Sequence, residues 1–193
     1  MSATEPAALL NSAVADYRKS NDLPKLLSTL RGITSRTEFT PADLMAATEP
    51  YRDIPEVAGP VYETIVAREP ANARALVILA NAYWLSGRGP DVVGELASRA
   101  IAADATNRGA WHLWALTAEV LRERVTRWEQ VSKRFPADDL ARAALADNAA
   151  SLASTEDDPV ALKLAIDTFT ELRERTANPA QRRAIDDALN ALG

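Results

Sequence analysis

Prolines that follow helix-capping residues divide this chain into many short helices. Thr40, Asp158 and Asn178 can each cap a helix, and each is followed directly by a proline. Proline suits the first helical position because the N–H that it lacks would have no partner there. The capping side chain accepts a hydrogen bond from the first-turn amides. Gly89, also followed by proline, gives a weaker version of the same signal. These starts predict a succession of short helices joined by short turns.

Composition and apolar spacing both favour helix between these starts. The 193 residues include 38 Ala and only 7 Gly, and Ala is the strongest helix former. Leu76, Leu79, Ala80 and Tyr83 fall at i, i+3, i+4 and i+7, which places them on one helical face. Further capping candidates are Asn72, Asn107 and Asp138. We predict an all-α chain with helices near 5–19, 23–35, 41–50, 55–68, 72–87, 90–104, 107–121, 124–135, 138–153, 159–175 and 179–191.

A pattern that begins at Asn72 starts again 35 residues later, at Asn107. The segment from Asn72 to Tyr83 resembles the first helix of a tetratricopeptide repeat (TPR). The resemblance rests on Leu76, Leu79, Ala80 and Tyr83 in that helix, and on Val93, Ala97 and Ala100 in the next. Neighbouring units repeat the offsets with Ala58, Tyr62, Ile65 and Pro70, then with Trp111, Trp114, Ala115, Trp128, Val131 and Pro136. A looser unit has Leu145, Ala146, Ala149, Ala165, Phe169 and Leu172.

The resemblance implies a right-handed α-solenoid of about four TPR-like hairpins. Each hairpin cannot bury its apolar face alone, so neighbours must stack. The repeats cover residues 41–175, residues 1–40 form a divergent capping hairpin, and 176–193 form a capping helix. All of these belong to one domain, 1–193. Two points stay open: whether 107–135 is one helix or two, and whether 1–40 lies in the concave groove.

The resemblance also implies which side chains line the concave groove. In the family, certain positions of the first helix of each repeat face a bound peptide. Projected onto this chain, those positions are Arg74, Val77, Ile78, Asn81, Trp84, His112, Leu116, Glu119, Ala143 and Asp147. Asn81 matches one position of the carboxylate clamp that holds chaperone tails, but Val77 and His112 stand where basic residues would help. We therefore expect an extended or helical peptide with apolar anchors.

Two of these residues have competing interpretations. Trp84 is either an exposed anchor for a partner or a residue that packs against the N-terminal hairpin. His112 is either a peptide contact or an ordinary surface histidine. A catalytic role is not expected, because no nucleophile and orienting acid lie near it in the sequence. The Ala-rich stretch around Ala143, Ala144 and Ala150 predicts close helix packing, either with residues 179–191 or with a second copy.

Composition excludes several classes of site. The chain has no Cys and one His, so no thiolate, multi-histidine or Glu-x-x-His metal site can form. We predict no cofactor, no metal and no catalytic residue. The net charge of −5 and the lack of a basic cluster argue against nucleic acid. No apolar stretch is long enough to insert into a membrane, and no secretory signal is seen, so a cytoplasmic location is expected.

The sequence therefore favours a non-catalytic module that binds a peptide or partner protein through a concave groove. A self-associating assembly protein is the alternative, with a homo-oligomer as its product. An all-α ligand binder or enzyme is a third hypothesis, which a buried acid beside His112 would support.

Overall fold

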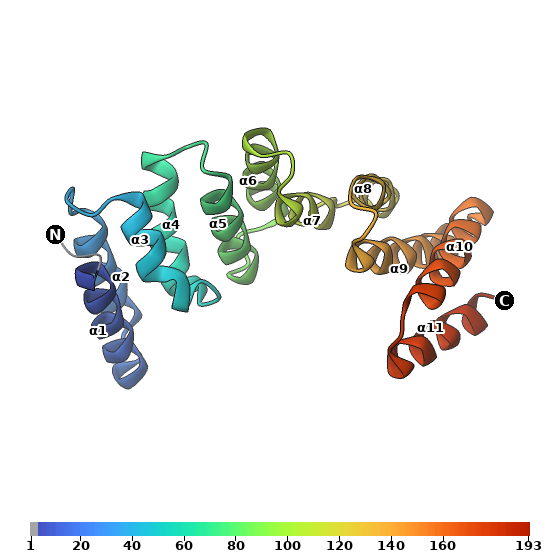
Figure 1. The fold of residues 1–193 in the computed structure, drawn as a ribbon, viewed down its shortest axis with the longest axis horizontal. Helices are drawn as coiled ribbons and strands as arrows, with labels where there is room; N and C mark the ends of the chain where they lie inside the picture. Colours follow the sequence, from blue (N-terminus) through green and yellow to red (C-terminus); the bar gives the residue numbers. More distant parts are fainter. Residues whose placement is uncertain (1–3) are drawn as a thin grey trace. The chain divides into compact units, whose positions relative to one another are not determined.

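The computed structural model describes residues 4–193; residues 1–3, which the sequence analysis placed in the first hairpin, lie outside them. Across the described residues there are eleven α-helices, one 3₁₀ helix and no strand (Figure 1). The chain divides into two compact units, Met1–Leu113 (unit 1) and Trp114–Gly193 (unit 2), each described by itself below. The expectation of a single domain over 1–193 stays a prediction.

Unit 1 contains α1 (Thr4–Ser20), α2 (Leu23–Thr34), α3 (Pro41–Thr48), the 3₁₀ helix η1 (Glu49–Tyr51), α4 (Pro55–Arg68), α5 (Ala73–Leu85) and α6 (Pro90–Ala103). Helix α7 (Arg108–Leu116) includes the boundary between the units, and unit 2 continues with α8 (Leu121–Arg134), α9 (Asp139–Glu156), α10 (Pro159–Arg175) and α11 (Pro179–Leu192). The described residues therefore form the predicted series of eleven short helices.

The predicted caps explain where several of these helices begin. Thr40 forms a capping box with Asp43, and its hydroxyl accepts from the Asp43 amide. The carboxylates of Asp138 and Asp158 each accept two first-turn amides. Asn72 accepts the Ala75 amide in the same way. Each cap satisfies amides that have no partner inside the helix, so local chemistry fixes these starts.

Unit 1 is a stack of helical hairpins. Helix α1 packs against α2 and α3, α2 against α4, and α4 and α6 against α5. Small and large apolar side chains, among them Ala58, Tyr62, Leu76 and Ala97, are fully buried between these helices. Within this unit, α1 and α2 thus form one more hairpin on the stack, as predicted for residues 1–40.

Unit 2 continues the same way of packing. Helix α9 packs against both α8 and α10, and α11 packs against α10. Ile185 of α11 joins a buried cluster with Ala146, Phe169 and Leu172. Ala143 and Ala150 of α9, together with Ala188, Leu189 and Leu192 of α11, pack against that cluster. The Ala-rich face of α9 is therefore in part an intramolecular contact with the C-terminal helix.

The segment 107–135 forms two helices. Helix α7 ends at Leu116, earlier than the predicted 121, and α8 begins at Leu121 rather than 124. Two arginines of α8 bind the carbonyls that this break leaves without helical partners. Arg124 donates from Nε and Nη2 to the Ala118 carbonyl at 2.9 and 2.8 Å, and Arg127 donates to the Trp114 carbonyl at 2.6 Å. Side-chain donors here replace the glycine that often ends a helix.

Helix α3 also ends sooner than predicted, at Thr48 rather than 50, and continues as η1. Pro50 lies in this 3₁₀ helix, and its missing N–H cannot extend the α-helical hydrogen bonds. Of the tryptophans predicted to pack, Trp128 is buried, whereas Trp111 and Trp114 are half-buried. No helix among the described residues is long and apolar enough to cross a membrane.

Candidate protein-interaction surface

Helix α5 carries a stripe of the predicted groove residues in unit 1. Arg74, Ile78, Asn81 and Trp84 recur every three or four residues along it, which keeps them on neighbouring parts of one face. Arg74 is exposed, Ile78 and Asn81 are half-buried, and Trp84 is 39% exposed. Leu85, directly after Trp84, is 55% exposed. Trp84 therefore presents part of its indole to solvent, and its role as an anchor stays a prediction.

Arg74 at the start of this stripe belongs to an ion-pair group. Its Nη2 lies 2.9 Å from Glu49 Oε2, and Arg52 Nη1 lies 3.0 Å from the other Glu49 oxygen. Tyr62 is fully buried near these charges; burial, and secondarily the charge of Glu49, raises the pKa of its phenol. The Tyr62 hydroxyl has no hydrogen-bond partner among the described residues. One carboxylate thus holds two guanidinium groups at this end of the α5 stripe.

Val77 differs from its neighbours on α5, because it packs against α7. A Cβ atom added to Gly109 would lie 3.3 Å from Val77 Cγ1, so the two helices approach closely there. His112 follows Gly109 by three residues, which places it on nearly the same side of α7. His112 is half-buried. Val77 of α5 and His112 of α7 therefore lie on neighbouring helices of unit 1.

Tyr83 makes a second polar group in unit 1, which the sequence did not reveal. Its hydroxyl donates to Glu63 Oε1 at 2.6 Å, and the Arg88 guanidinium lies 4.8 Å from the centre of its ring. Burial, and then the hydrogen bond to Glu63, raises the pKa of Tyr83 to about 12. Glu63 and Tyr83 line two grooves, one of about 460 Å³ beside α2 and α4 and one of about 440 Å³ beside α4 and α6.

The four remaining predicted residues lie in unit 2. Leu116 ends α7 and is 36% exposed, and Glu119 lies exposed in the turn that follows. Ala143 packs towards α11, as described above. Asp147, one turn later on α9, has a carboxyl pKa raised by desolvation. These residues do not form one continuous stripe like that on α5, because Ala143 contributes to internal packing.

Sequence reasoning missed the partners of these residues. Glu49 and Arg74 are 25 positions apart, and Tyr83 and Glu63 are 20 apart. Such contacts depend on hairpin stacking, and no local spacing signals them. Within residues 4–193, no group of three or more His, Asp or Glu side chains could hold a metal ion.

The chain was compared with family models, curated proteins and solved structures. No family model matches, and no curated protein matches. Among solved structures, PilF of Pseudomonas aeruginosa has a TM-score of 0.64 at 12% identity, covering 98% of this chain and 85% of its own. A crystal structure of MamA gives 0.61 at 14% identity, covering 91% and 98%. TTC0263, a TPR protein of Thermus thermophilus, gives 0.56 at 16% identity, covering 97% and 99%.

The chain has the TPR fold. The resemblance that the sequence suggested is thereby confirmed, and so is the all-α solenoid class. In TPR terms, α3 to α10 correspond to the four predicted hairpins, with α1 and α2 before them and α11 after them. The identity to these structures is low, at 12 to 16%. The likeness concerns the fold, and the function has to be argued from the surface.

Proposed function

We propose that this protein is a non-catalytic interaction module that binds a segment of a partner protein on the exposed stripe of α5 in unit 1. The proposed contacts are Arg74, Ile78, Asn81 and Trp84, with His112 on the neighbouring helix. The observation that carries the proposal is the exposure of Trp84 beside Leu85. Tryptophan is frequent among binding hot spots because it offers a large rigid surface at low entropic cost.

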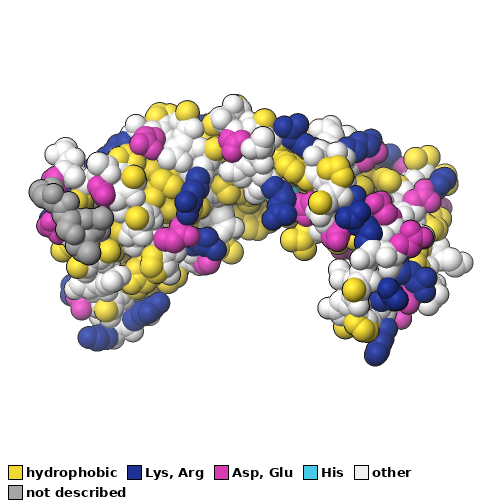
Figure 2. All heavy atoms as spheres, viewed as in Figure 1, with side chains coloured by type: hydrophobic (Ala, Val, Ile, Leu, Met, Phe, Trp, Pro, Cys, Tyr) yellow, Lys and Arg dark blue, Asp and Glu magenta, His cyan; other side chains and the backbone are white. Residues whose placement is uncertain are grey.

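The character of the surface supports a protein partner. On the face shown in Figure 2, apolar side chains are interspersed with basic and acidic ones, and the two signs of charge lie side by side. A surface for nucleic acid would gather Lys and Arg along the path of the phosphates. A peptide with one or two apolar anchors and a carboxylate near Arg74 would match the α5 stripe. Leu116, Glu119, Ala143 and Asp147 of unit 2 stay predictions.

Peptides selected from a random display library against the full chain would test the proposal. Their affinities would be measured by calorimetry for the wild type, for Trp84→Ala and for Val92→Ala as a matched control. Val92 is an exposed apolar residue of α6 in the same unit. Loss of a hot-spot tryptophan should weaken binding by about tenfold or more, while the control keeps its affinity.

Equal affinities for the wild type and Trp84→Ala would place the binding surface elsewhere. Light scattering of the pure protein tests the alternative hypothesis, which is self-association. A stable homo-oligomer that Trp84→Ala converts to a monomer would assign the same surface to self-association instead.

A further inference from the structure

The groove beside α2 and α4 (the α2–α4 groove) presents apolar side chains to solvent. It has a volume of about 460 Å³ and is lined by α2, by α4, and by the end of α5 with the turn that follows. Leu23, the first residue of α2, is 38% exposed. Leu27, Pro55 and Pro60 are half-buried. A Cβ atom added to Gly59 would meet nothing within 4 Å, so the groove has room there for an apolar side chain of an occupant.

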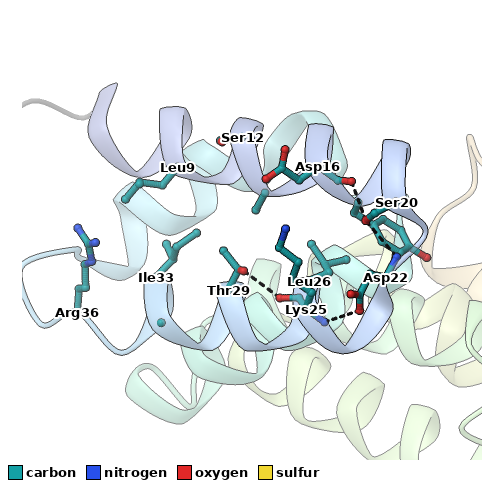
Figure 3. A pocket seen from close by; sticks show the side chains of 13 residues that line it. Leu9, Ser12, Asp16, Ser20, Asp22, Lys25, Leu26, Thr29, Ile33 and Arg36 are labelled. Atoms are coloured by element: carbon teal, nitrogen blue, oxygen red, sulfur yellow. Dashed lines mark hydrogen bonds between the residues drawn. The ribbon is translucent and has the colours of Figure 1, made fainter.

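The groove between α1 and α2 in the first hairpin has a different character. Its aliphatic residues Ala13, Leu26 and Ile33 are buried within the hairpin. Asp16 and Lys25, which Figure 3 shows on its two walls, are polar and exposed. Of these two grooves, the α2–α4 groove is therefore the one that suits an apolar side chain.

Pro60 leaves a main-chain acceptor in the wall of the α2–α4 groove without its usual donor. It lies inside α4, and proline has no N–H to donate to the carbonyl four residues earlier. That carbonyl belongs to Glu56, which lines the groove together with Pro60. Residues four apart share one face of a helix, so this carbonyl lies on the groove side of α4. An N–H of an occupant can take the place of the missing helical donor.

Arg31 and Glu56 bring two unpaired charges to the same groove. Arg31 donates from Nε to the Leu27 carbonyl at 3.3 Å. Neither the Arg31 guanidinium nor the Glu56 carboxylate forms an ion pair with any residue among 4–193. By contrast, Arg88 lies 3.8 Å from Glu63. The groove thus offers one guanidinium on α2 and one carboxylate on α4 to a partner of complementary charge.

An extended segment suits these features better than a helix does. The main-chain N–H groups of a helix are already bonded within it, whereas those of an isolated extended chain are available to an acceptor. From Leu23 to Arg31, α2 runs about 12 Å at the usual helical rise. About four residues of extended chain span that length, and alternate side chains face the same way.

We propose that the α2–α4 groove binds an extended segment of a partner protein, about five residues long, with an acidic and an apolar residue at alternate positions. The apolar side chain lies over Gly59, the acidic one pairs with Arg31, and one main-chain N–H donates to the Glu56 carbonyl. A basic or neutral residue at the other end suits the Glu56 carboxylate. The α5 residue that lines this groove is Tyr83, which does not belong to the α5 stripe, so the two surfaces are independent.

The test uses capped peptides of about nine residues, with Glu, Leu and Lys at alternate central positions and valine between them. NMR titration of the isotope-labelled full chain gives the affinities and locates the binding site. One matched peptide has Gln in place of Glu and should bind about two- to fivefold more weakly, as expected for an exposed ion pair. Three others are each methylated at one central main-chain nitrogen. At least one of them should bind about two- to tenfold more weakly, because it lacks the donated N–H.

Two proline variants separate the hydrogen bond from the apolar contact. Pro60→Ala supplies the missing N–H inside α4, so the effect of N-methylation should disappear. The unmodified peptide should also bind this variant about two- to tenfold more weakly. Pro55→Ala is the matched control, because Pro55 lines the same groove but stands at the first helical position, where no carbonyl waits for its N–H. This control should keep the effect of N-methylation, and both chains should stay folded because alanine favours helix.

Further variants test the charge and the place of binding. Arg31→Ala should abolish the preference for Glu over Gln, whereas Arg18→Ala, on the same hairpin outside the groove lining, should keep it. Trp84→Ala should leave every affinity unchanged, and a loss of binding in this variant would overturn the proposal by moving the peptide to the α5 stripe. No binding at millimolar peptide, or an effect of N-methylation that is equal in the wild type and Pro60→Ala, overturns it as well. A homodimer in light scattering that Gly59→Leu dissociates would do so by assigning the groove to a second copy.

Discussion

Arg142 Nε lies 2.9 Å from Glu171 Oε1, and this ion pair joins α9 to α10 in unit 2. The Arg142 side chain is only 9% exposed, and it also donates to the Pro136 carbonyl and to Asp139. Arg175 binds Asp139 from the other side at 2.8 Å. Arg142 therefore links the loop before α9 with α10, the helix after α9.

Replacing Arg142 should destabilise unit 2. Arg142→Ala removes two hydrogen bonds and the ion pair with Glu171 from a buried position and leaves the Pro136 carbonyl without that donor, so we expect a loss of about 2 kcal/mol. Arg175→Ala, at a more exposed position, should cost at most about 1 kcal/mol. Urea unfolding followed by circular dichroism gives the two values, and hydrogen exchange should locate the weakened amides in α9 and α10. Equal losses would contradict the special role of Arg142.

Helix starts in this chain have local causes, whereas the end of α7 has a cause in another helix. Thr40, Asp138 and Asp158 fix helix starts through side chains two or three residues from their partners, so the sequence predicts those starts. The end of α7 was not predicted, because it depends on arginines of the next helix that bind its carbonyls. Helix propensity alone would have carried α7 further.

The candidate surface likewise depends partly on local sequence and partly on contacts between helices. The stripe on α5 follows from helical periodicity and the TPR resemblance, so its residues could be named in advance. That Val77 packs against Gly109 while Trp84 stays exposed depends on how α7 stacks on α5.

Burial of Tyr83, together with its hydrogen bond to Glu63, should be measurable as a delayed ionisation of the phenol. Its pKa of about 12 in the folded chain exceeds the value of about 10 of a free tyrosine. Because the pKa is raised in the folded chain, the stabilisation provided by the protonated Tyr83 phenol is complete below about pH 10. It is lost as the pH rises through about 12. We expect Tyr83→Phe to cost about 1 kcal/mol at neutral pH. That difference from the wild type should shrink as the solution becomes more alkaline.

Spectroscopic titration of tyrosinate absorbance would check the assignment. The latest-ionising component that belongs to Tyr83 should disappear in Tyr83→Phe. Retention of the complete late component in this variant would contradict the assignment.

The charged carboxylate of Asp147 should make unit 2 less stable at neutral pH than a neutral side chain at that position would. Desolvation raises the pKa of its carboxyl, although the residue is exposed, so the folded state holds the proton more tightly than the unfolded state does. The stabilisation provided by the protonated Asp147 carboxyl is therefore complete below the unfolded-state pKa of about 3.9. It is lost as the pH rises through the pKa of the folded state. Asp147→Asn should be more stable than the wild type at pH 7, and the gap should close in acid. Thermal unfolding of both proteins over a pH series measures this, and a constant gap would refute it.

Two Gly→Ala substitutions in unit 1 should have opposite effects. Gly32 lies inside α2 and Gly87 in the turn after α5, and at both positions an added Cβ would meet nothing within 4 Å. The backbone differs, because Gly87 has φ +71°, a region that side chains with a Cβ rarely adopt. Gly32→Ala should raise the free energy of unfolding by about 0.5–1 kcal/mol through helix propensity, and Gly87→Ala should lower it by about 1 kcal/mol or more. Urea denaturation of the two variants would decide this, and changes of the same sign would show that backbone conformation is not the deciding difference between the two sites.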